Sequence, residues 1–329
     1  MNIIGSLDLQ NDLLLSHMNS GSLLLTTSQA AELLQVHESS VKRWANEGKL
    51  KPAKTEGGHR RISLPELLDF ARVERADSDL IYVAPFTEEL AVAALACRER
   101  NYFQPLAKLI VDICDTHPSS FLVATLNYLE SAFEISKVRA FDLGIAEALR
   151  IVGNQWASGE RSIAQERRFT QKIIDAIHQL RRPLVNPPDK LAPLAIVGCS
   201  ESCYHEVGSL YIRSVLEEAG WNVCYLGVNV PFSEYGTLQS ELNAKLVAIS
   251  FVSPSVNSDA RRCLTILSGL YRDENPYYLA FGGGGLNKES IDSKGWPFLA
   301  LRLEKDSELF QIWARQKAIL NKNLKAKKG

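Results

Sequence analysis

The feature that most constrains the fold is a set of four short apolar runs in the C-terminal part of the chain, separated by stretches with helical spacing. The runs are Leu194–Cys199, Trp221–Leu226, Leu246–Phe251 and Tyr277–Phe281. Short apolar runs that alternate with helices are typical of strands in a parallel sheet covered on both faces. The sequence therefore predicts a doubly wound, Rossmann-like α/β domain over residues 192–320.

The block before this domain has a different apolar period. Between residues 87 and 184 apolar side chains recur at helical spacing, for instance at Val138, Phe141, Ile145, Leu149 and Val152. This spacing predicts a bundle of four or five helices. Four prolines between Pro183 and Pro193 cannot lie inside a helix, so we expect a linker there. The charged stretch from Arg72 to Asp79 predicts another linker, in front of the bundle.

The N-terminal block, residues 23–73, holds two short predicted helices. Thr27 or Ser28 can cap a helix over residues 29–35, and a second helix would run from Glu38 to Asn46. Two short helices joined by a tight turn predict a helix-turn-helix.

Positive charge is concentrated around the second of these helices. The whole chain has a formal net charge of -1, yet residues 42–61 contain seven Lys or Arg against two Glu. Lys42 and Arg43 would point outward while Val41 and Trp44 pack inward. A cationic helix face suits the phosphates and guanine edges of a DNA major groove.

A wing would follow this helix. Gly57 and Gly58 permit a tight hairpin, and three nitrogen-bearing side chains come directly after them. The side chains predicted to contact DNA are Ser40, Lys42, Arg43, His59, Arg60 and Arg61. For any one of them alone, the alternative is a solvated cationic face or a satisfied surface histidine.

The combined pattern of this block resembles the MerR family of transcriptional regulators. The shared features are a Thr-x-x-Ala-Ala-x-Leu helix from Thr27, the pair Arg43-Trp44 and a Gly-Gly-His-Arg-Arg wing ending at Arg61. The resemblance implies a winged helix-turn-helix that binds double-stranded DNA. Reading a palindromic operator would need two such heads, so we expect a homo-oligomer, a dimer or a tetramer.

Polar side chains and glycines follow the predicted strands of the α/β domain. The first strand runs into a loop that carries His205, the third ends near Ser250, and the fourth ends in Gly282–Gly285. In open α/β sheets, ligands bind beyond the carboxyl ends of the strands. Glycines let a ligand approach the backbone closely. The sequence thus predicts a ligand site at this edge.

These strand ends resemble those of cobalamin-binding domains, which carry a His-x-x-Gly loop, a Ser-containing strand end and a Gly-Gly strand end. The resemblance implies that His205 binds cobalt as a neutral imidazole and that the nucleotide tail runs past Ser250 to the glycines. The implied contacts are Cys203, His205, Gly208, Ser250, Ser253, Gly282 and Gly283. The family has Asp at the position of Cys203, where a carboxylate orients the imidazole, a role that a neutral thiol fills poorly.

One further pattern lies in the helical block. The order of the three blocks, together with Trp156 and Glu166, resembles the light-sensing regulators of the CarH/LitR type. In those regulators a Trp and a Glu-His pair cover the upper face of the corrinoid. Here Arg167 replaces the His, and Arg stays protonated and cannot bind cobalt. The alternative is that Trp156 is simply an aromatic residue in the core of the bundle.

The leading hypothesis from this resemblance is a repressor, not an enzyme, whose oligomeric state and operator binding are set by adenosylcobalamin as a light sensor. The alternative is a MerR-like regulator whose degenerate domain binds another ligand or a protein partner without light sensing. A corrinoid enzyme would need a substrate barrel or partner module, which the three blocks leave no length to encode.

Composition limits the remaining classes. No apolar run approaches the roughly 20 residues needed to cross a bilayer, and we expect a cytoplasmic protein with no membrane partner. Residues 1–22 show no helix cap or sustained period, so we expect a mobile leader. The six cysteines have no zinc-type spacing and are expected to be reduced thiols of the core.

Overall fold

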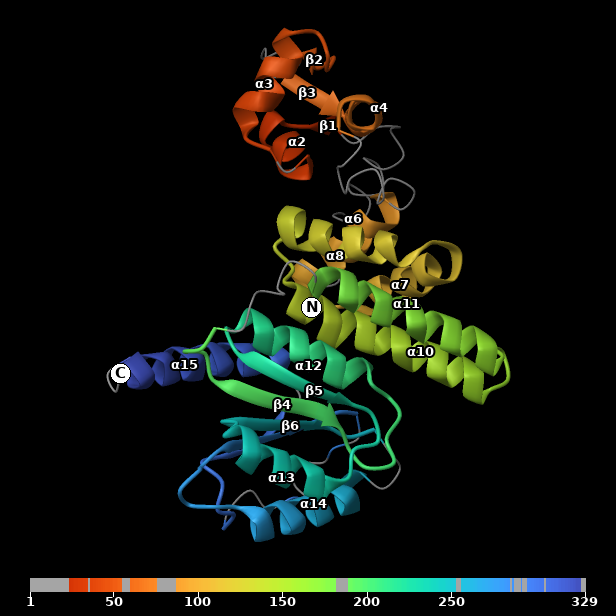
Figure 1. Ribbon diagram of the computed structural model, residues 1–329. Coiled ribbons are helices and arrows are strands. Elements are labelled where there is room, and N and C mark those ends of the chain that lie inside the picture. The colour runs from red at the N-terminus through yellow and green to blue at the C-terminus, as the bar shows by residue number, and fades with distance from the viewer. Residues whose placement is uncertain are drawn as a thin grey trace, which may run out of the picture. The chain divides into compact units, whose positions relative to one another are not determined.

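The computed structural model describes most of the chain. It covers residues 24–34, 36–54, 60–75, 87–181, 189–252, 256–284, 286, 291, 295–304 and 306–326 (Figure 1). The chain divides into two compact units, Met1–Ala140 and Phe141–Gly329, each of which is described by itself. The predicted leader, residues 1–22, lies outside the described residues. The predicted domain limits of 23–73, 87–184 and 192–320 stay predictions.

The first unit begins with a head of three helices and a small sheet. Its elements are β1 (Leu24–Leu25), α2 (Thr27–Leu33), α3 (Glu38–Asn46), β2 (Ala53–Lys54), β3 (Arg60–Ser63) and α4 (Leu64–Glu74). The strands are antiparallel in the order β1-β3-β2. The predicted winged helix-turn-helix is therefore present, with an extra short strand in front of it.

Local hydrogen bonds fix the helix starts of the head. His37 caps α3 by accepting a bond from the backbone N–H of Ser39, and the Ser63 hydroxyl caps α4. The Thr27 hydroxyl donates to Glu38 at 2.6 Å and joins α2 to α3. The predicted linker start at Arg72 is wrong, because α4 continues to Glu74 and Arg72 pairs with Asp69 one helical turn before it.

The rest of the first unit is helical. It contains α6 (Thr87–Arg100), α7 (Gln104–Thr116), α8 (Ser119–Phe133) and the single turn α9 (Lys137–Arg139). Helix α7 has seven buried residues. The predicted helical block, residues 87–184, is helical in these four segments, and its limits stay a prediction.

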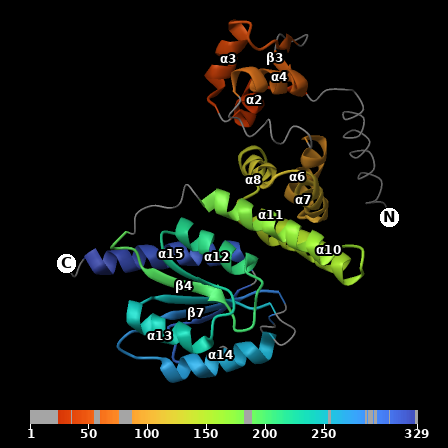
Figure 2. The ribbon, with the colours of Figure 1, turned by 45° about the vertical axis from the view of Figure 1, so that its right-hand side comes forward.

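The second unit begins inside a π-helical turn, η2 (Ala140–Ile145), at Phe141, and continues with α10 (Ala146–Ala157) and α11 (Ile163–Arg181). The helices α10 and α11 run side by side in both Figure 1 and Figure 2. The end of α11 is joined to the next helix, α12 (Val207–Glu218), by a nearly buried ion pair. In it the Arg181 guanidinium donates to both carboxylate oxygens of Glu217, at 2.7 and 2.9 Å.

A five-stranded parallel sheet forms the remainder of this unit. Its further elements are β4 (Leu194–Cys199), β5 (Asn222–Gly227), α13 (Phe232–Leu242), β6 (Leu246–Ser250), α14 (Val256–Leu270), β7 (Tyr278–Gly282), β8 (Leu301–Glu304) and α15 (Ser307–Ala326). Helices α12 and α15 cover one face and α13 and α14 the other (Figures 1 and 2). The predicted doubly wound sheet is confirmed, and its four predicted strands lie within one residue of their predicted limits.

The fifth strand, β8, was not predicted. Its sequence Leu-Arg-Leu-Glu alternates apolar and charged residues over only four positions, so it lacks the continuous apolar run of the inner strands. Among the described helices, none combines the length and apolar character needed to span a bilayer.

The strand order β5-β4-β6-β7-β8 reverses direction between β4 and β6. Chain connections leave this point toward opposite sides of the sheet, so a crevice opens at the carboxyl ends of these two strands. Beneath it the sheet packs on an aromatic core that includes Phe232, Tyr235, Phe251 and Phe281. The topology therefore places any ligand site beside Cys199 and Ser250, the last residues of β4 and β6.

Candidate DNA-binding surface and ligand pocket

Helix α3 has one buried and one exposed face. Val41 is fully buried, and the half-buried Trp44 packs on Phe70 with ring centroids 4.9 Å apart. Lys42 and Arg43 are exposed and are held along the helix by Glu38 and Glu47. The inward and outward directions predicted from the sequence match the structure.

Arg60 on strand β3 of the wing links the wing to α3. Arg60 donates to the Asn46 side-chain oxygen at 2.7 Å and to the backbone carbonyl of Lys42 at 3.5 Å. Arg61 is half-buried beside it, and Ser40 is half-buried on α3. His59 lies outside the described residues. Arg60 thus lies against the exposed face of α3, so wing and helix present one cationic surface.

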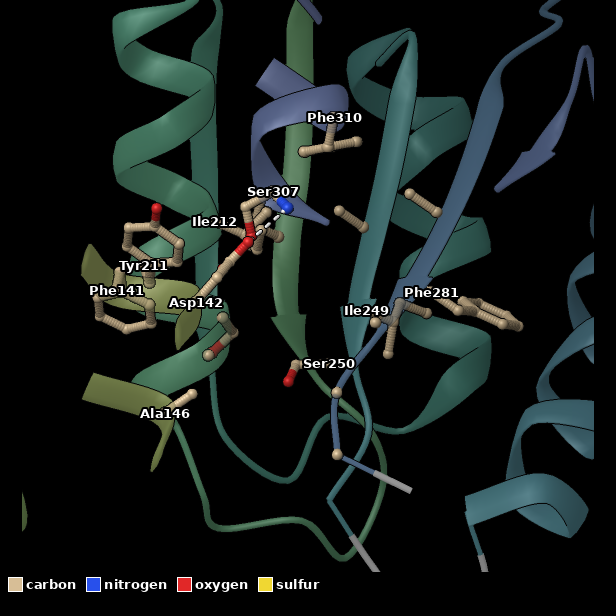
Figure 3. A pocket seen from close by; sticks show the side chains of 18 of the residues that line it. Phe141, Asp142, Ala146, Tyr211, Ile212, Ile249, Ser250, Phe281, Ser307 and Phe310 are labelled. Atoms are coloured by element: carbon tan, nitrogen blue, oxygen red, sulfur yellow. Dashed lines mark hydrogen bonds between the residues drawn. The ribbon is translucent and has the colours of Figure 1, made fainter. Parts of the chain in front are cut away.

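A cavity of about 310 Å³ opens at the carboxyl ends of β4, β6 and β7 (Figure 3). Small and apolar side chains dominate its wall, as in most small-molecule sites. The lining residues from the sheet and its loops include Val197, Gly208, Ser209, Ala248, Ile249, Ser250, Ala280 and Gly282–Gly284. Of the residues predicted to contact a cofactor, Gly208, Ser250, Gly282 and Gly283 line this cavity.

Two glycines keep the cavity open. A Cβ added at Gly283, which has φ of +121°, would lie 2.0 Å from the carbonyl oxygen of Phe251. A Cβ at Gly208 would lie 3.1 Å from the Ser250 hydroxyl. Neither position tolerates a side chain without displacing its neighbours, so the backbone itself forms this part of the wall.

The turn η2 supplies a wall that the sequence did not reveal. Phe141 stacks on Tyr211 with ring centroids 3.5 Å apart, and Asp142 accepts hydrogen bonds from the N–H and hydroxyl of Ser307, both at 2.7 Å (Figure 3). Burial raises the pKa of Asp142 against the lowering effect of the Ser307 bonds. Helical spacing had marked Phe141 only as a bundle residue, because a π-turn has no distinct apolar period.

The loop with His205 follows β4. His205 is exposed, and the hydroxyl of Tyr204 beside it accepts a bond from Asn229 at 3.1 Å. Cys203 is buried under this loop. A hydrogen bond with the Cys199 thiol, together with contacts from His205, lowers the pKa of Cys203, whereas the same pair raises the pKa of Cys199. The side chain of Cys203 therefore lies beside His205. Ser253 lies outside the described residues.

The hairpin of α10 and α11 carries the remaining predicted contacts. The Trp156 side chain is 50% exposed, so it is not a buried core aromatic. Glu166 accepts a bond from Thr170 at 2.9 Å and pairs with the exposed Arg167. The cavity lining includes none of Trp156, Glu166 and Arg167. Among the described residues, no group of three or more His, Cys, Asp or Glu side chains is placed to hold a metal ion.

A helix-turn-helix domain family matches residues 24–72. The head is a helix-turn-helix domain. The transcriptional repressor CarH of Myxococcus xanthus is 23% identical over 253 residues, which is 72% of this chain and 82% of that protein. The repressor CarA of the same organism is 27% identical over 128 residues, 38% of this chain and 42% of that protein. The predicted kinship with helix-turn-helix regulators of this type is confirmed.

Two solved structures are similar to this chain at low identity. The monomethylamine corrinoid protein of Methanosarcina barkeri is 15% identical, with a TM-score of 0.46, over 70% of this chain and 98% of its own. A cobalamin-binding protein from Desulfitobacterium hafniense DCB-2 is 16% identical, with a TM-score of 0.34, over 69% of this chain and 97% of its own.

Proposed function

We propose that this chain is a transcriptional repressor whose occupancy of double-stranded DNA is controlled by a corrinoid bound in the cavity at the ends of β4, β6 and β7. One observation carries the proposal. A helix-turn-helix head and a glycine-walled cavity, with His205 three residues before the lining residue Gly208, occur in one chain.

DNA binding rests on the cationic surface of the head. Lys42 and Arg43 extend from α3 into solvent, and Arg60 lies against that helix. Guanidinium and ammonium groups in this arrangement neutralise phosphates and reach guanine edges. Ser40, His59 and Arg61 complete the proposed contact surface. Because a palindromic operator presents two half-sites, we propose that the regulator acts as a homo-oligomer.

The residues of the cavity fit a cobalamin. The mostly apolar cavity that Gly208, Ser250 and Gly283 help to line offers surfaces on which the flat heteroaromatic base of a nucleotide tail would pack. His205 is exposed and carries an imidazole nitrogen of the kind that binds cobalt. Cys203 lies beside this imidazole, at the position where a carboxylate would orient it. Bound adenosylcobalamin would supply a light-sensitive cobalt–carbon bond.

We place Trp156 and Glu166 over the upper side of the corrinoid. The indole is exposed on the α10–α11 hairpin and so is free to pack on a ligand. Such a regulator has no catalytic role of its own and acts in the cytoplasm, where its operator lies.

One observation favours a second candidate. Arg167 stands at the position of a histidine in light-sensing regulators, and its guanidinium pairs with Glu166 at 3.5 Å. A cation there cannot take over a cobalt coordination position. The second candidate is therefore a regulator of the same architecture whose cavity takes another ligand or a protein partner, without light sensing.

Absorbance spectroscopy separates these candidates. The full chain is mixed with adenosylcobalamin in the dark, desalted, and scanned before and after green light. We expect a retained corrinoid band that changes on illumination, and weaker retention in His205→Ala than in the control His178→Ala, an exposed histidine of α11. No retained band overturns the corrinoid proposal, and a retained band that light leaves unchanged overturns light sensing.

A further inference from the structure

Much of the loop that carries His205 is exposed to solvent. We call residues 200–206, between β4 and α12, the His205 loop. Within it the side chains of Ser202, Tyr204 and His205 are exposed. Packing alone does not fix exposed side chains, so hydrogen bonds to the loop decide where the imidazole lies.

One residue of another loop bonds to three consecutive residues of the His205 loop. Asn229 follows β5 and is itself exposed. Its side-chain oxygen accepts from the backbone N–H of Ser202 at 2.9 Å, and its own backbone N–H donates to the carbonyl of Cys203 at 2.9 Å. Its side-chain nitrogen donates to the Tyr204 hydroxyl at 3.1 Å. Asn229 thus directs its backbone donor and both polar side-chain atoms at the segment just before His205.

The backbone angles on both sides of these bonds are uncommon. Asn229 has φ of +53°, in the left-handed region, which Asn adopts more readily than most residues other than Gly. Ser202 is also left-handed, with φ of +62°, although Ser adopts this region less readily. The bond from the Ser202 N–H to Asn229 therefore stabilises a loop conformation that the loop's own sequence does not favour.

Two other contacts reach the same side of the loop, and both are weaker. Glu201 pairs with Arg262 of α14 at 2.9 Å, but their side chains are 34% and 51% exposed, and an exposed ion pair contributes little. The Cys203 thiol donates to the carbonyl of Val252 at 3.6 Å, and a thiol is a weak donor. The three bonds of Asn229 therefore hold this segment more firmly than either contact.

The chain after the imidazole is fixed separately. The Cys199 thiol donates to the carbonyl of His205 at 3.5 Å. The carbonyl of Glu206 accepts from the N–H of Leu210 at 2.9 Å, at the beginning of α12. Loss of the Asn229 amide would therefore release the backbone on one side of His205 and leave the other side in place.

We propose that Asn229 is the positioning residue of His205: by holding residues 202–204, it places the imidazole where it binds the cobalt of a corrinoid. This inference rests on the proposed function, because it concerns the same ligand. It adds to the site a residue from the loop after β5, which acts through the His205 loop and needs no contact with the cobalt.

Two variants separate the amide of Asn229 from its backbone. Asn229→Gly keeps a residue that readily adopts positive φ and removes the amide. Asn229→Asp keeps an acceptor for the Ser202 N–H, and its second oxygen can accept from the Tyr204 hydroxyl, which donates as well as accepts. The matched control is Asn243→Gly. Asn243 ends α13, is exposed and left-handed with φ of +52°, and bonds to Lys245 instead of the His205 loop.

Hydrogen exchange on the ligand-free full chain, followed by NMR, tests the hold on the loop. The Ser202 amide should exchange at least about 10-fold faster in Asn229→Gly than in Asn243→Gly, because its acceptor is lost. Asn229→Asp should exchange as wild type does. Circular dichroism shows that each variant is folded. Equal exchange of this amide in the two Gly variants overturns the proposal whether or not a corrinoid binds.

Electron paramagnetic resonance tests the imidazole itself. The full chain is labelled with ¹⁵N-histidine and mixed with cob(II)alamin, whose signal is split by the nitrogen below the cobalt. A labelled imidazole gives a doublet, and the unlabelled base of the nucleotide tail gives a triplet. Wild type, Asn229→Asp and Asn243→Gly should show the doublet, and His205→Ala should lose it. Asn229→Gly should show the triplet in its place, because the imidazole is no longer held.

The outcomes separate this inference from the function on which it rests. A doublet of the same size in Asn229→Gly and Asn243→Gly overturns the positioning role while leaving the corrinoid in the cavity. A triplet in wild type shows that His205 does not bind the cobalt and overturns the inference as well. A wild-type chain that retains no corrinoid overturns the proposed function and, with it, the placement of the imidazole on cobalt.

Discussion

Helix α3, which we propose contacts DNA, takes its cations from nine consecutive residues, whereas the cavity takes its wall from segments between Phe141 and Phe310. On α3 the groups proposed to contact DNA are long, exposed side chains, and ion pairs along the helix hold them. In the cavity the proposed ligand needs open volume, and the missing side chains of Gly208 and Gly283 leave that volume free. The DNA-binding surface should therefore tolerate single changes that the cavity does not. The predictions below test this difference, from the largest effect to the smallest.

Truncating a core side chain of the head should destabilise the whole head and lower its DNA affinity. Phe70→Ala removes a buried ring that packs on Trp44, and should destabilise the head by about 3–5 kcal/mol. Hydrogen exchange over residues 24–75 and DNA affinity are the readouts. The control Val73→Ala changes an 80% exposed residue of the same helix. Corrinoid retention should stay intact in both variants, and its loss in Phe70→Ala would show that the two regions fold as one.

A single added methyl group in the cavity wall should weaken ligand binding. Gly283→Ala places a Cβ against the Phe251 carbonyl and should weaken corrinoid binding at least about 100-fold. Gly269→Ala, in α14 and outside the cavity lining, is the control, because a Cβ there meets no atom within 4 Å. Equilibrium dialysis measures both. Equal affinities in the two variants would exclude the Gly283 wall as part of the site.

The contact between η2 and α15 should have an intermediate effect. Asp142→Ala leaves the backbone N–H and hydroxyl of Ser307 without their acceptor, at a cost of about 1–3 kcal/mol in the free energy of unfolding. Asp142→Asn keeps one acceptor oxygen and should lose less. Urea unfolding of the full chain ranks the variants, and the same midpoint for Asp142→Ala as for wild type would refute a structural role for this contact.

The smallest effect is expected on α3. Arg43→Ala should lower DNA affinity roughly 10-fold and reduce the slope of log affinity against log salt by about one, because one phosphate contact is lost. Fluorescence anisotropy with a labelled duplex gives both values. Arg150→Ala, an exposed ion-paired arginine of α10, serves as the control. Identical slopes for the two variants would remove Arg43 from the DNA-binding surface.

The same difference decides what the sequence could predict. The directions of Val41, Lys42 and Trp44 follow from helical periodicity, because all three lie on one short helix. The four inner strands followed from continuous apolar runs. The walls formed by Phe141, Asp142 and Ser307 did not, because segments more than 160 residues apart meet there and no local pattern records such a meeting.

The proximity of Cys203 to His205 could be predicted only in part from the sequence. The motif placed the two side chains two residues apart, but only the structure shows the second thiol, Cys199, beside them.

The central claim is that a ligand in the cavity controls the head. Its most direct test is the affinity of the full chain for a duplex from its own upstream region, measured by anisotropy in the dark with and without adenosylcobalamin, and again after green light. The account predicts a change of at least about 10-fold on adding the corrinoid, reversed by light, and no change in Gly283→Ala. An affinity that stays constant while the corrinoid is demonstrably bound would contradict it.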